Sequence, residues 1–194
     1  MKDPRYKFTI TVSAHILLLD SKNRVLMSKR PKTWEWGPDR WGVMGGKVYE
    51  HENFFETIRR KSIQELGFEI KPEGLYQIKQ LLIKDKQAFM FFFVSKHQGQ
   101  KLTGEMEEYK WFGKKEIVET PLEKFAEYFY KNMLTKFVAG NVKLLPVSMV
   151  ESLDYVNLSD DADYKKWFRG MIKRDYDPEK IADYKRWKAD IKSK

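Results

Sequence analysis

The chain has 194 residues, of which 42% are hydrophobic and 34% charged, so it is long enough for one full domain with its own core plus a modest appendage. It contains no cysteine, which excludes a disulfide framework, a thiolate metal site and a cysteine nucleophile. The formal net charge of +9 favours anionic partners such as nucleotides, nucleic acid or a membrane surface. Acidic residues are interspersed almost everywhere, however, so a solubilising surface is the simpler explanation of the charge.

No segment of the sequence has the features of a targeting or membrane-spanning element. The first ten residues lack the apolar core and the small-residue cleavage site of a signal peptide. The longest apolar runs, residues 16–19 and 88–94, are too short to span a bilayer. We therefore expect a cytoplasmic protein with no membrane partner.

The first third of the chain is expected to be rich in strands. Residues 8–19 are apolar and β-branched, residues 20–23 supply turn residues, and residues 24–29 continue as a second strand, which predicts a hairpin. A loop rich in tryptophan, glycine and proline follows over residues 31–40. Residues 41–44 are predicted to form a short strand that ends in a pair of glycines.

A helix is expected from Glu52 or Asn53 to Leu66, with Gly67 as its left-handed C-terminal cap. The residues that recur at helical spacing and would face the core are Phe55, Ile58, Ser62 and Leu66. Ser62 is polar, but a serine can bond back to a carbonyl one turn earlier.

Strands are predicted over residues 68–84, 87–96 and 108–112. A second helix is predicted over residues 120–138 and would end at Gly140. Its start carries a cap, a proline in the first turn and a glutamate that can close a capping box, namely Thr120, Pro121 and Glu123. Two mixed sheets between helices would follow from this order.

Residues 141–194 are predicted to form a helical extension that packs on a main domain of residues 1–140. Two stripes at helical spacing support it. The first consists of Tyr164, Trp167, Phe168, Met171 and Ile172, and the second of Ile181, Tyr184, Trp187 or Lys188, and Ile191. Because acidic residues alternate with the basic ones, a packed or oligomeric face is favoured over RNA binding, and a homodimer stays open.

The central feature is the stretch of residues 45–68, which reads GGKVYEHENFFETIRRKSIQELGF. Glycines let a backbone approach a ligand closely, and a loop that leads into a helix presents N–H groups suited to phosphate. The stretch resembles the Nudix box of MutT-like Nudix hydrolases, and the positions that fit are Gly46, Glu52, Arg60, Glu65, Gly67 and Phe68. The resemblance covers roughly residues 7–138 and implies an α/β (α+β) fold, the Nudix αβα sandwich with a mixed sheet.

The box is degenerate at its metal-binding positions. In the family, three helix glutamates hold Mg²⁺ or Mn²⁺ together with a glycine carbonyl, because hard cations need oxygen ligands and a diphosphate needs its charge neutralised. Here those three positions are Lys61, Gln64 and Glu65. The resemblance implies that Glu65, the Gly45 carbonyl and Gln64 would form a weakened site for Mg²⁺ or Mn²⁺.

Further roles follow from the resemblance at neighbouring positions. The family often draws another carboxylate from the downstream region, which makes Glu107 a candidate metal ligand and Glu108 a candidate base acting beside Glu65. The box residues Gly46, Glu52, Arg60 and Gly67 would be structural, with Glu52 and Arg60 paired to fix the shape of the loop.

Candidate substrate contacts are Lys61, Arg40, Trp36 and Tyr49. Lys61 would contact a substrate phosphate directly in place of one metal, or it marks a protein that has lost catalysis, and the sequence leaves both open. Aromatic rings beside the loop can stack on nucleobases, although tryptophans in loops are more often partly buried anchors.

Two functions are therefore expected. The first is a Nudix-type hydrolase that cleaves the diphosphate bond of a nucleoside diphosphate linked to another moiety, in a reaction that depends on a divalent metal. The alternative is a catalytically impaired Nudix domain that binds a nucleotide or RNA as a sensor or scaffold. The retained frame from Gly45 to Gly67 favours the enzyme, whereas Lys61 and Gln64 favour the binding domain. A purely structural interaction module is a third and weaker reading.

Overall fold

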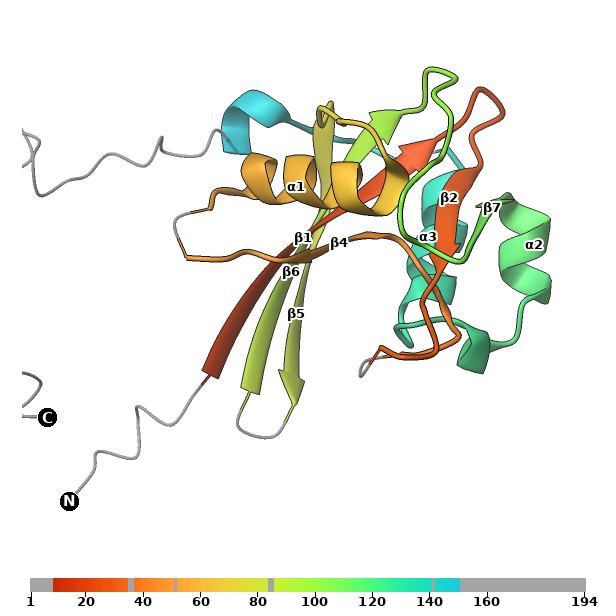
Figure 1. Cartoon of the computed structure of the whole chain (residues 1–194), viewed down its shortest axis with the longest axis horizontal. Coiled ribbons are helices and arrows are strands. Elements are labelled where there is room, and N and C mark those ends of the chain that lie inside the picture. The colour runs from red at the N-terminus through yellow and green to blue at the C-terminus, as the bar shows by residue number, and fades with distance from the viewer. Residues whose placement is uncertain (1–8, 35–36, 51, 84–85, 141, 151–194) are drawn as a thin grey trace, which may run out of the picture. The chain divides into compact units, whose positions relative to one another are not determined.

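The computed structural model describes residues 9–34, 37–50, 52–83, 86–140 and 142–150, and it is drawn in Figure 1. The strands are β1 (Thr9–Leu19), β2 (Val25–Lys29), β3 (Trp41–Gly42), β4 (Met44–Lys47), β5 (Gly74–Ile83), β6 (Lys86–Lys96), β7 (Glu108–Phe112) and β8 (Leu145–Pro146). The helices are α1 (Phe54–Leu66), α2 (Lys114–Glu119) and α3 (Tyr130–Val138), and the 3-10 turns are η2 (Leu122–Lys124) and η3 (Val147–Val150).

The strands form one eight-stranded mixed sheet in the order β3-β2-β1-β6-β5-β8, with β4 paired to β1 and β7 paired to β2. β1 runs parallel to β6 along its whole length, whereas the other strand pairs are antiparallel. The hairpin of β1 and β2 is confirmed, but these strands pair through Leu19 and Val25 at its turn. The expectation of two separate sheets is wrong, because this pair joins the section of β2, β3 and β7 to the central strands.

Helices cover both faces of the sheet, as the αβα sandwich predicts. β1 alternates its side chains between two cores, because successive residues of a strand point to opposite faces. Ile16 and Leu18 pack in one core with Ile58 and Leu66 of α1, whereas Leu17 packs in the other core. The residues that α3 adds to that second core are Tyr130, Met133, Leu134 and Phe137. Figure 1 shows α1 and α3 on opposite sides of the central strands.

Both ends of α1 are capped, and the left-handed cap at Gly67 is the one that the sequence predicts. At the start, the Asn53 side chain accepts hydrogen bonds from the backbone N–H groups of Phe55 and Glu56, each at 2.9 Å. Glu56 completes the capping box by accepting from the Asn53 backbone N–H at 2.7 Å. At the end, Gly67 has a φ of 88° and donates its N–H to the Ile63 carbonyl.

Removing this N-cap should destabilise the domain. We expect Asn53→Ala to lower the free energy of unfolding by about 1 kcal/mol, because two N–H groups of the first turn lose their acceptor. Urea unfolding followed by circular dichroism measures the change. Asn53→Asp keeps an acceptor oxygen at the same position and should stay close to wild type. An equal loss in both variants would assign the effect to something other than the cap.

Ser62 occupies a core-facing position of α1 and is fully buried. Its hydroxyl donates to the Arg59 carbonyl at 2.9 Å and accepts from the Ile70 backbone N–H at 3.1 Å. The predicted bond back along the helix is therefore confirmed. The bond from Ile70 also holds the segment that follows α1 against the helix.

The predicted strand over residues 68–84 is wrong at its start, because β5 begins only at Gly74. Residues 68–73 contact both α1 and β6, because Glu69 pairs with Arg59 at 3.1 Å and the Lys71 carbonyl accepts from the Ser95 hydroxyl at 2.9 Å. Pairing with β6 starts where Gly74 lies opposite Val94. The hydrophobic run therefore begins before the strand does.

The predicted helix over residues 120–138 is wrong in its first half. α2 ends at Glu119, and the Thr120 hydroxyl donates back to the Glu116 carbonyl at 2.7 Å, so this residue closes a helix instead of opening one. Pro121 precedes the short turn η2, and α3 begins only at Tyr130. The predicted end near residue 138 is confirmed, and Gly140 follows it with a φ of 87°.

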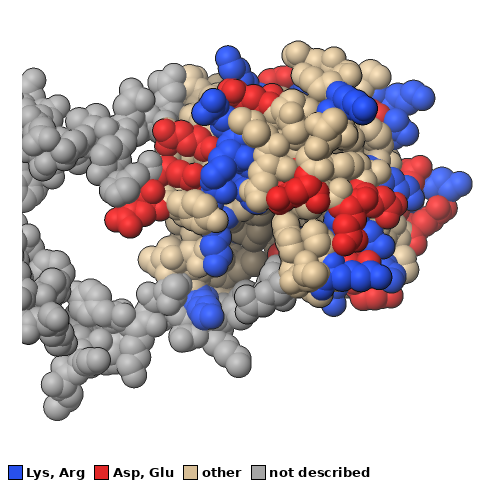
Figure 2. Space-filling model, viewed as in Figure 1, with Lys and Arg blue, Asp and Glu red and all other residues tan. Residues whose placement is uncertain are grey.

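Residues 145–150 contribute β8, which pairs with the start of β5, and the turn η3. The helical stripes predicted within residues 164–172 and 181–191 lie outside the described residues, so the extension stays a prediction. Within the part of the chain that the structure describes, no helix has the length and apolar character needed to cross a membrane. Figure 2 shows basic and acidic side chains interspersed on the face that is seen.

Candidate functional site

The glycine pair Gly45 and Gly46 lies in β4, and we call it the glycine loop. It brings the backbone of β4 unusually close to β1. Gly45 lies opposite His15 in the strand pairing and has a φ of 148°. A Cβ on Gly45 would lie 2.4 Å from the Ala14 carbonyl oxygen and 2.6 Å from the His15 Cα. Both neighbours are backbone atoms that cannot move aside, so this position requires glycine.

Glu65 lies in the last turn of α1 and points at this loop. Its side chain is 1% exposed, and its Oε2 accepts from the Gly45 backbone N–H at 3.4 Å. Tyr109 of β7 donates its hydroxyl to the Glu65 carbonyl and so holds the last turn of the helix. Burial raises the pKa of Glu65 against the opposing effects of Lys61 and the Gly45 N–H.

Lys61 fills the space between the box side chains. Its Nζ lies 2.8 Å from the Glu65 Oε1 and donates to the Gln64 Oε1 at 2.9 Å. The same nitrogen lies 5.9 Å from the centre of the Trp34 ring. The Lys61 side chain is only 13% exposed, so its ammonium is held inside the site.

These residues do not fit the divalent cation that the family uses. Lys61 engages oxygens of both Glu65 and Gln64, and the second Glu65 oxygen faces the Gly45 N–H. A divalent ion about 5 Å from an ammonium would be repelled by roughly 7 kcal/mol at an effective dielectric constant of about 20. Among the described residues, no group of three or more His, Cys, Asp or Glu side chains is placed to hold a metal ion.

Glu107 and Glu108, the downstream candidates, are both exposed. Glu108 lies opposite Lys29 in the pairing of β7 with β2. The pKa of Lys29 is raised first by its hydrogen bond with Asp39 and to a smaller extent by the two glutamates. The structure therefore places Glu107 and Glu108 in the electrostatic neighbourhood of Lys29.

The acidic residue of this region that acts on Glu65 is Glu105, which the sequence reasoning missed. Its charge contributes to the raised pKa of Glu65, and its backbone N–H donates to the Gln64 carbonyl at 3.1 Å. The neighbouring Gly104 packs on α1 so closely that a Cβ there would lie 2.1 Å from the Glu65 carbonyl carbon. That glycine was the available signal that the loop touches the helix.

Glu52 and Arg60 form a clamp that fixes the loop between β4 and α1. The Arg60 guanidinium donates to the Glu52 Oε2 at 2.8 Å and to the Lys47 carbonyl at 3.0 Å. The same Glu52 oxygen accepts from the Thr57 hydroxyl at 2.9 Å and from the Tyr49 backbone N–H at 3.1 Å. The geometry is that of the structural pair that the resemblance implies.

Acid should weaken the fold through this clamp. The hydrogen bond with Arg60 lowers the pKa of Glu52 from 4.5 to about 2. Since the folded pKa is the lower one, ionised Glu52 stabilises the fold fully above pH 4.5, and this stability is lost as the pH falls toward about 2. Urea unfolding at a series of pH values measures the slope. Glu52→Gln should flatten it, and an unchanged slope would assign the acid sensitivity to other carboxyl groups.

Two of the remaining substrate candidates are described: Tyr49 follows β4, and Arg40 precedes β3. Tyr49 is 59% exposed, and the Arg60 guanidinium covers its ring at 4.1 Å from the centroid. Arg40 is exposed just before β3, and its carbonyl accepts from the Arg30 N–H at 3.0 Å. Trp36 lies outside the described residues.

Two buried polar side chains near the site also escaped the sequence reasoning. His15 bonds the Ser13 hydroxyl through Nε2 at 3.0 Å and stacks on Phe92. Burial, with Arg30 and Lys61 nearby, lowers the pKa of His15 to about 3 and keeps the ring neutral at physiological pH. Burial also raises the pKa of Tyr130. A histidine inside an apolar strand was the only signal that the sequence offered.

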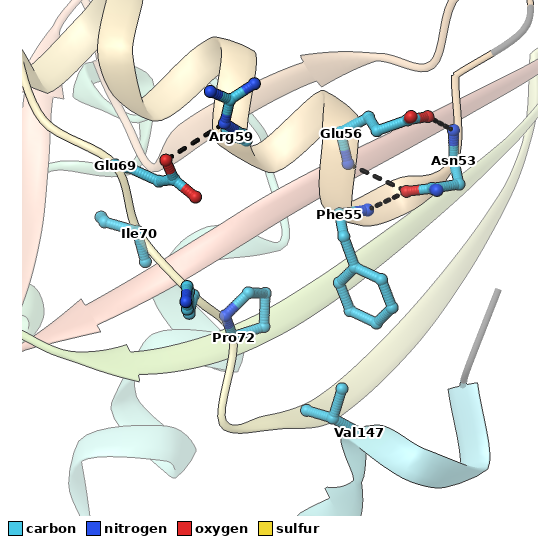
Figure 3. A pocket seen from close by; sticks show the side chains of 9 residues that line it. Asn53, Phe55, Glu56, Arg59, Glu69, Ile70, Pro72 and Val147 are labelled. Atoms are coloured by element: carbon cyan, nitrogen blue, oxygen red, sulfur yellow. Dashed lines mark hydrogen bonds and ion pairs between the residues drawn. The ribbon is translucent and has the colours of Figure 1, made fainter. Parts of the chain in front are cut away.

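A cavity of about 340 Å³ lies on a different side of α1 (Figure 3). Phe55, Glu56 and Arg59 contribute to its lining from the helix, and Arg59 pairs with Glu69 at 3.1 Å. By helical spacing these residues face away from Lys61 and Glu65. The cavity is therefore separate from the glycine loop.

Comparison with known proteins agrees with this arrangement. Residues 9–133 match the family described as NUDIX domain. Two relatives named 8-oxo-dGTP diphosphatase, from Buchnera aphidicola subsp. Acyrthosiphon pisum (strain APS) and subsp. Schizaphis graminum (strain Sg), are 29% identical over 56 residues and 28% identical over 94 residues. These matches cover 29% and 48% of this chain, and 45% and 71% of the relatives, so less than half of the first relative is spanned.

A solved structure described as the MutT protein from Methanosarcina mazei Go1 superimposes with a TM-score of 0.59 and 20% sequence identity, over 74% of this chain and 99% of that chain. At this identity the likeness shows the fold. The family match over residues 9–133 shows that this chain belongs to the NUDIX family, and the structural likeness agrees with its fold.

Proposed function

We propose that this chain binds a nucleoside diphosphate linked to another group at the glycine loop, and that it does so without the divalent-metal hydrolysis of the family. The observation that carries the proposal is the ion pair between Lys61 and Glu65, with 2.8 Å between the two charged atoms. The positive charge that a diphosphate needs is supplied by this side chain. The oxygens that would hold a metal are engaged by the same side chain.

The loop suits phosphate recognition for two reasons. Gly45 and Gly46 carry no side chains, so a ligand can approach the β4 backbone closely. The Lys61 ammonium has three N–H donors and can pair with a phosphate oxygen as a point charge, as lysines do in other phosphate sites. Tyr49, Arg40 and Trp36 are the proposed contacts for the rest of the ligand, since aromatic rings stack on nucleobases. The name of the Buchnera relatives, 8-oxo-dGTP diphosphatase, supports a nucleotide as the ligand class.

The second candidate is the metal-dependent hydrolase that cleaves the diphosphate bond. Its support is the position of Glu65, which is buried and directed at Gly45, together with the name of the relatives. Gln64, Glu107 and Glu108 would be its further participants. This candidate requires Lys61 to leave its ion pair, because the ammonium and a divalent ion compete for the same oxygens.

Calorimetric titration with ADP-ribose, UDP-glucose and 8-oxo-dGTP separates the two. We expect at least one of these probes to bind equally well in EDTA and in Mg²⁺ or Mn²⁺, and chromatography to show no product. Metal-dependent product release that Glu65→Gln abolishes would establish the hydrolase instead. If none of the three probes binds under either condition, the proposal fails in favour of an interaction module.

A further inference from the structure

We infer that Lys61 is a tethered replacement for the divalent cation of the family, and that one substitution at this position turns the oxygens around its ammonium into a divalent-cation site. The inference deepens the proposed function and rests on it only for the nucleotide. What it adds concerns the metal, which can be tested without any nucleotide.

The Lys61 side chain runs along the glycine loop. Its stem passes over the glycine loop, since a Cβ on Gly46 would lie 2.8 Å from the Lys61 Cε and 3.3 Å from its Cδ. The glycine therefore makes room for the stem. The charged end is delivered to the inner side of the loop, where Glu65 lies.

The ammonium of Lys61 is surrounded by groups that suit a cation. Two oxygens, the Glu65 Oε1 and the Gln64 Oε1, lie 2.8 and 2.9 Å from Nζ, and the Trp34 ring lies 5.9 Å away. Glu105 adds negative charge to the neighbourhood, because it contributes to the raised pKa of Glu65. A carboxylate and an amide oxygen, with a second acidic group nearby, are ligands that a hard cation accepts.

The helix places positions 61 and 65 next to each other. Positions 61 and 65 are four residues apart in α1, so their side chains lie on the same face. Lys61→Glu would remove the ammonium and place a second carboxylate beside Glu65. The site would then hold two carboxylates and the Gln64 amide oxygen, and the repulsion that excludes a divalent ion would be gone.

A titration with Mn²⁺ alone, followed by the electron paramagnetic resonance signal of the free ion, tests the inference. We expect Lys61→Glu to bind Mn²⁺ at least tenfold more tightly than wild type, and Lys61→Glu/Glu65→Gln to lose the gain. Lys22→Glu makes the same change of charge in an exposed turn and should match wild type. The inference is overturned if wild type binds Mn²⁺ as tightly as Lys61→Glu, or if folded Lys61→Glu binds no better than wild type.

Two neighbouring carboxylates could prevent Lys61→Glu from folding, so Lys61→Gln provides a second route. This variant removes the cation without adding a charge. Its midpoint of thermal unfolding should rise on addition of Mn²⁺, whereas that of wild type should not. No rise in Lys61→Gln, with Lys61→Glu unfolded, overturns the inference.

The nucleotide arm keeps the two proposals distinguishable. If the Mn²⁺ pattern holds while ADP-ribose, UDP-glucose and 8-oxo-dGTP all fail to bind, the proposed function fails and the cation replacement stands. If one of these probes binds in EDTA but Lys61→Glu gains no Mn²⁺ site, the proposed function stands and the cation replacement fails.

Discussion

Lys61→Met is expected to lower the free energy of unfolding by about 3 kcal/mol, because it leaves a buried carboxylate without its counter-charge. Glu65 is 1% exposed, so water cannot solvate it once the ammonium 2.8 Å away is removed. The Gly45 N–H, at 3.4 Å, is a weak substitute. In the variant, Glu65 must either stay charged in a poorly solvating site or take up a proton. Urea unfolding near neutral pH measures the cost.

Two further variants show whether burial is the cause. Lys61→Met/Glu65→Gln removes both charges and should regain most of the lost stability, so that the double-mutant cycle gives a coupling of about 2 kcal/mol or more. Lys115→Met breaks another lysine–glutamate pair with the same i, i+4 spacing, but its side chain and that of Glu119 are 80% and 64% exposed. Its cost should stay below about 0.5 kcal/mol. Equal costs for Lys61→Met and Lys115→Met would contradict the buried ion pair.

The parts of the fold that the sequence predicted correctly depend on local signals. α1 is an example, because its amphipathic spacing, its start near Asn53 and the left-handed cap at Gly67 all lie within one segment. The family frame then supplied the αβα arrangement, which local patterns alone do not determine.

The errors arise where the same local signal serves two structures. A threonine followed by proline can open a helix, but Thr120 bonds backward to Glu116 and closes α2 instead. α2 itself has only six residues and one buried side chain, Ile117, so it carries no apolar stripe that periodicity could detect. Its existence depends on packing and not on pattern.

The sequence predicted the spacing of the candidate site residues, but it did not predict all of their contacts. Spacing placed Glu65 beside Gly45, and the structure brings the two together. The approach of Glu105 to Glu65 could not be predicted, because it depends on how tightly a distant loop packs on α1 through Gly104. Whether Lys61 points into solvent or pairs with Glu65 also depends on burial, which cannot be read from the sequence.

Gly45→Ala is expected to lower the free energy of unfolding by roughly 3–5 kcal/mol, as the sum of backbone strain and a clash that cannot relax. The φ of 148° lies in a region that residues with a Cβ rarely adopt. The added methyl group would lie 2.4 Å from the Ala14 carbonyl oxygen and 2.6 Å from the His15 Cα. β4 would have to move away from β1, and the N–H that faces Glu65 would move with it.

Gly99→Ala is the matched control, because it separates strain from clash. Gly99 also has a positive φ, of 87°, but a Cβ there would meet nothing within 4 Å. Its substitution should cost only about 1 kcal/mol. In addition, Gly45→Ala should weaken the binding of a nucleotide probe, whereas Gly99→Ala should leave it unchanged. If the two variants unfold at the same urea concentration, β4 does not pack on β1 through this glycine, and the close approach on which the candidate site depends is absent.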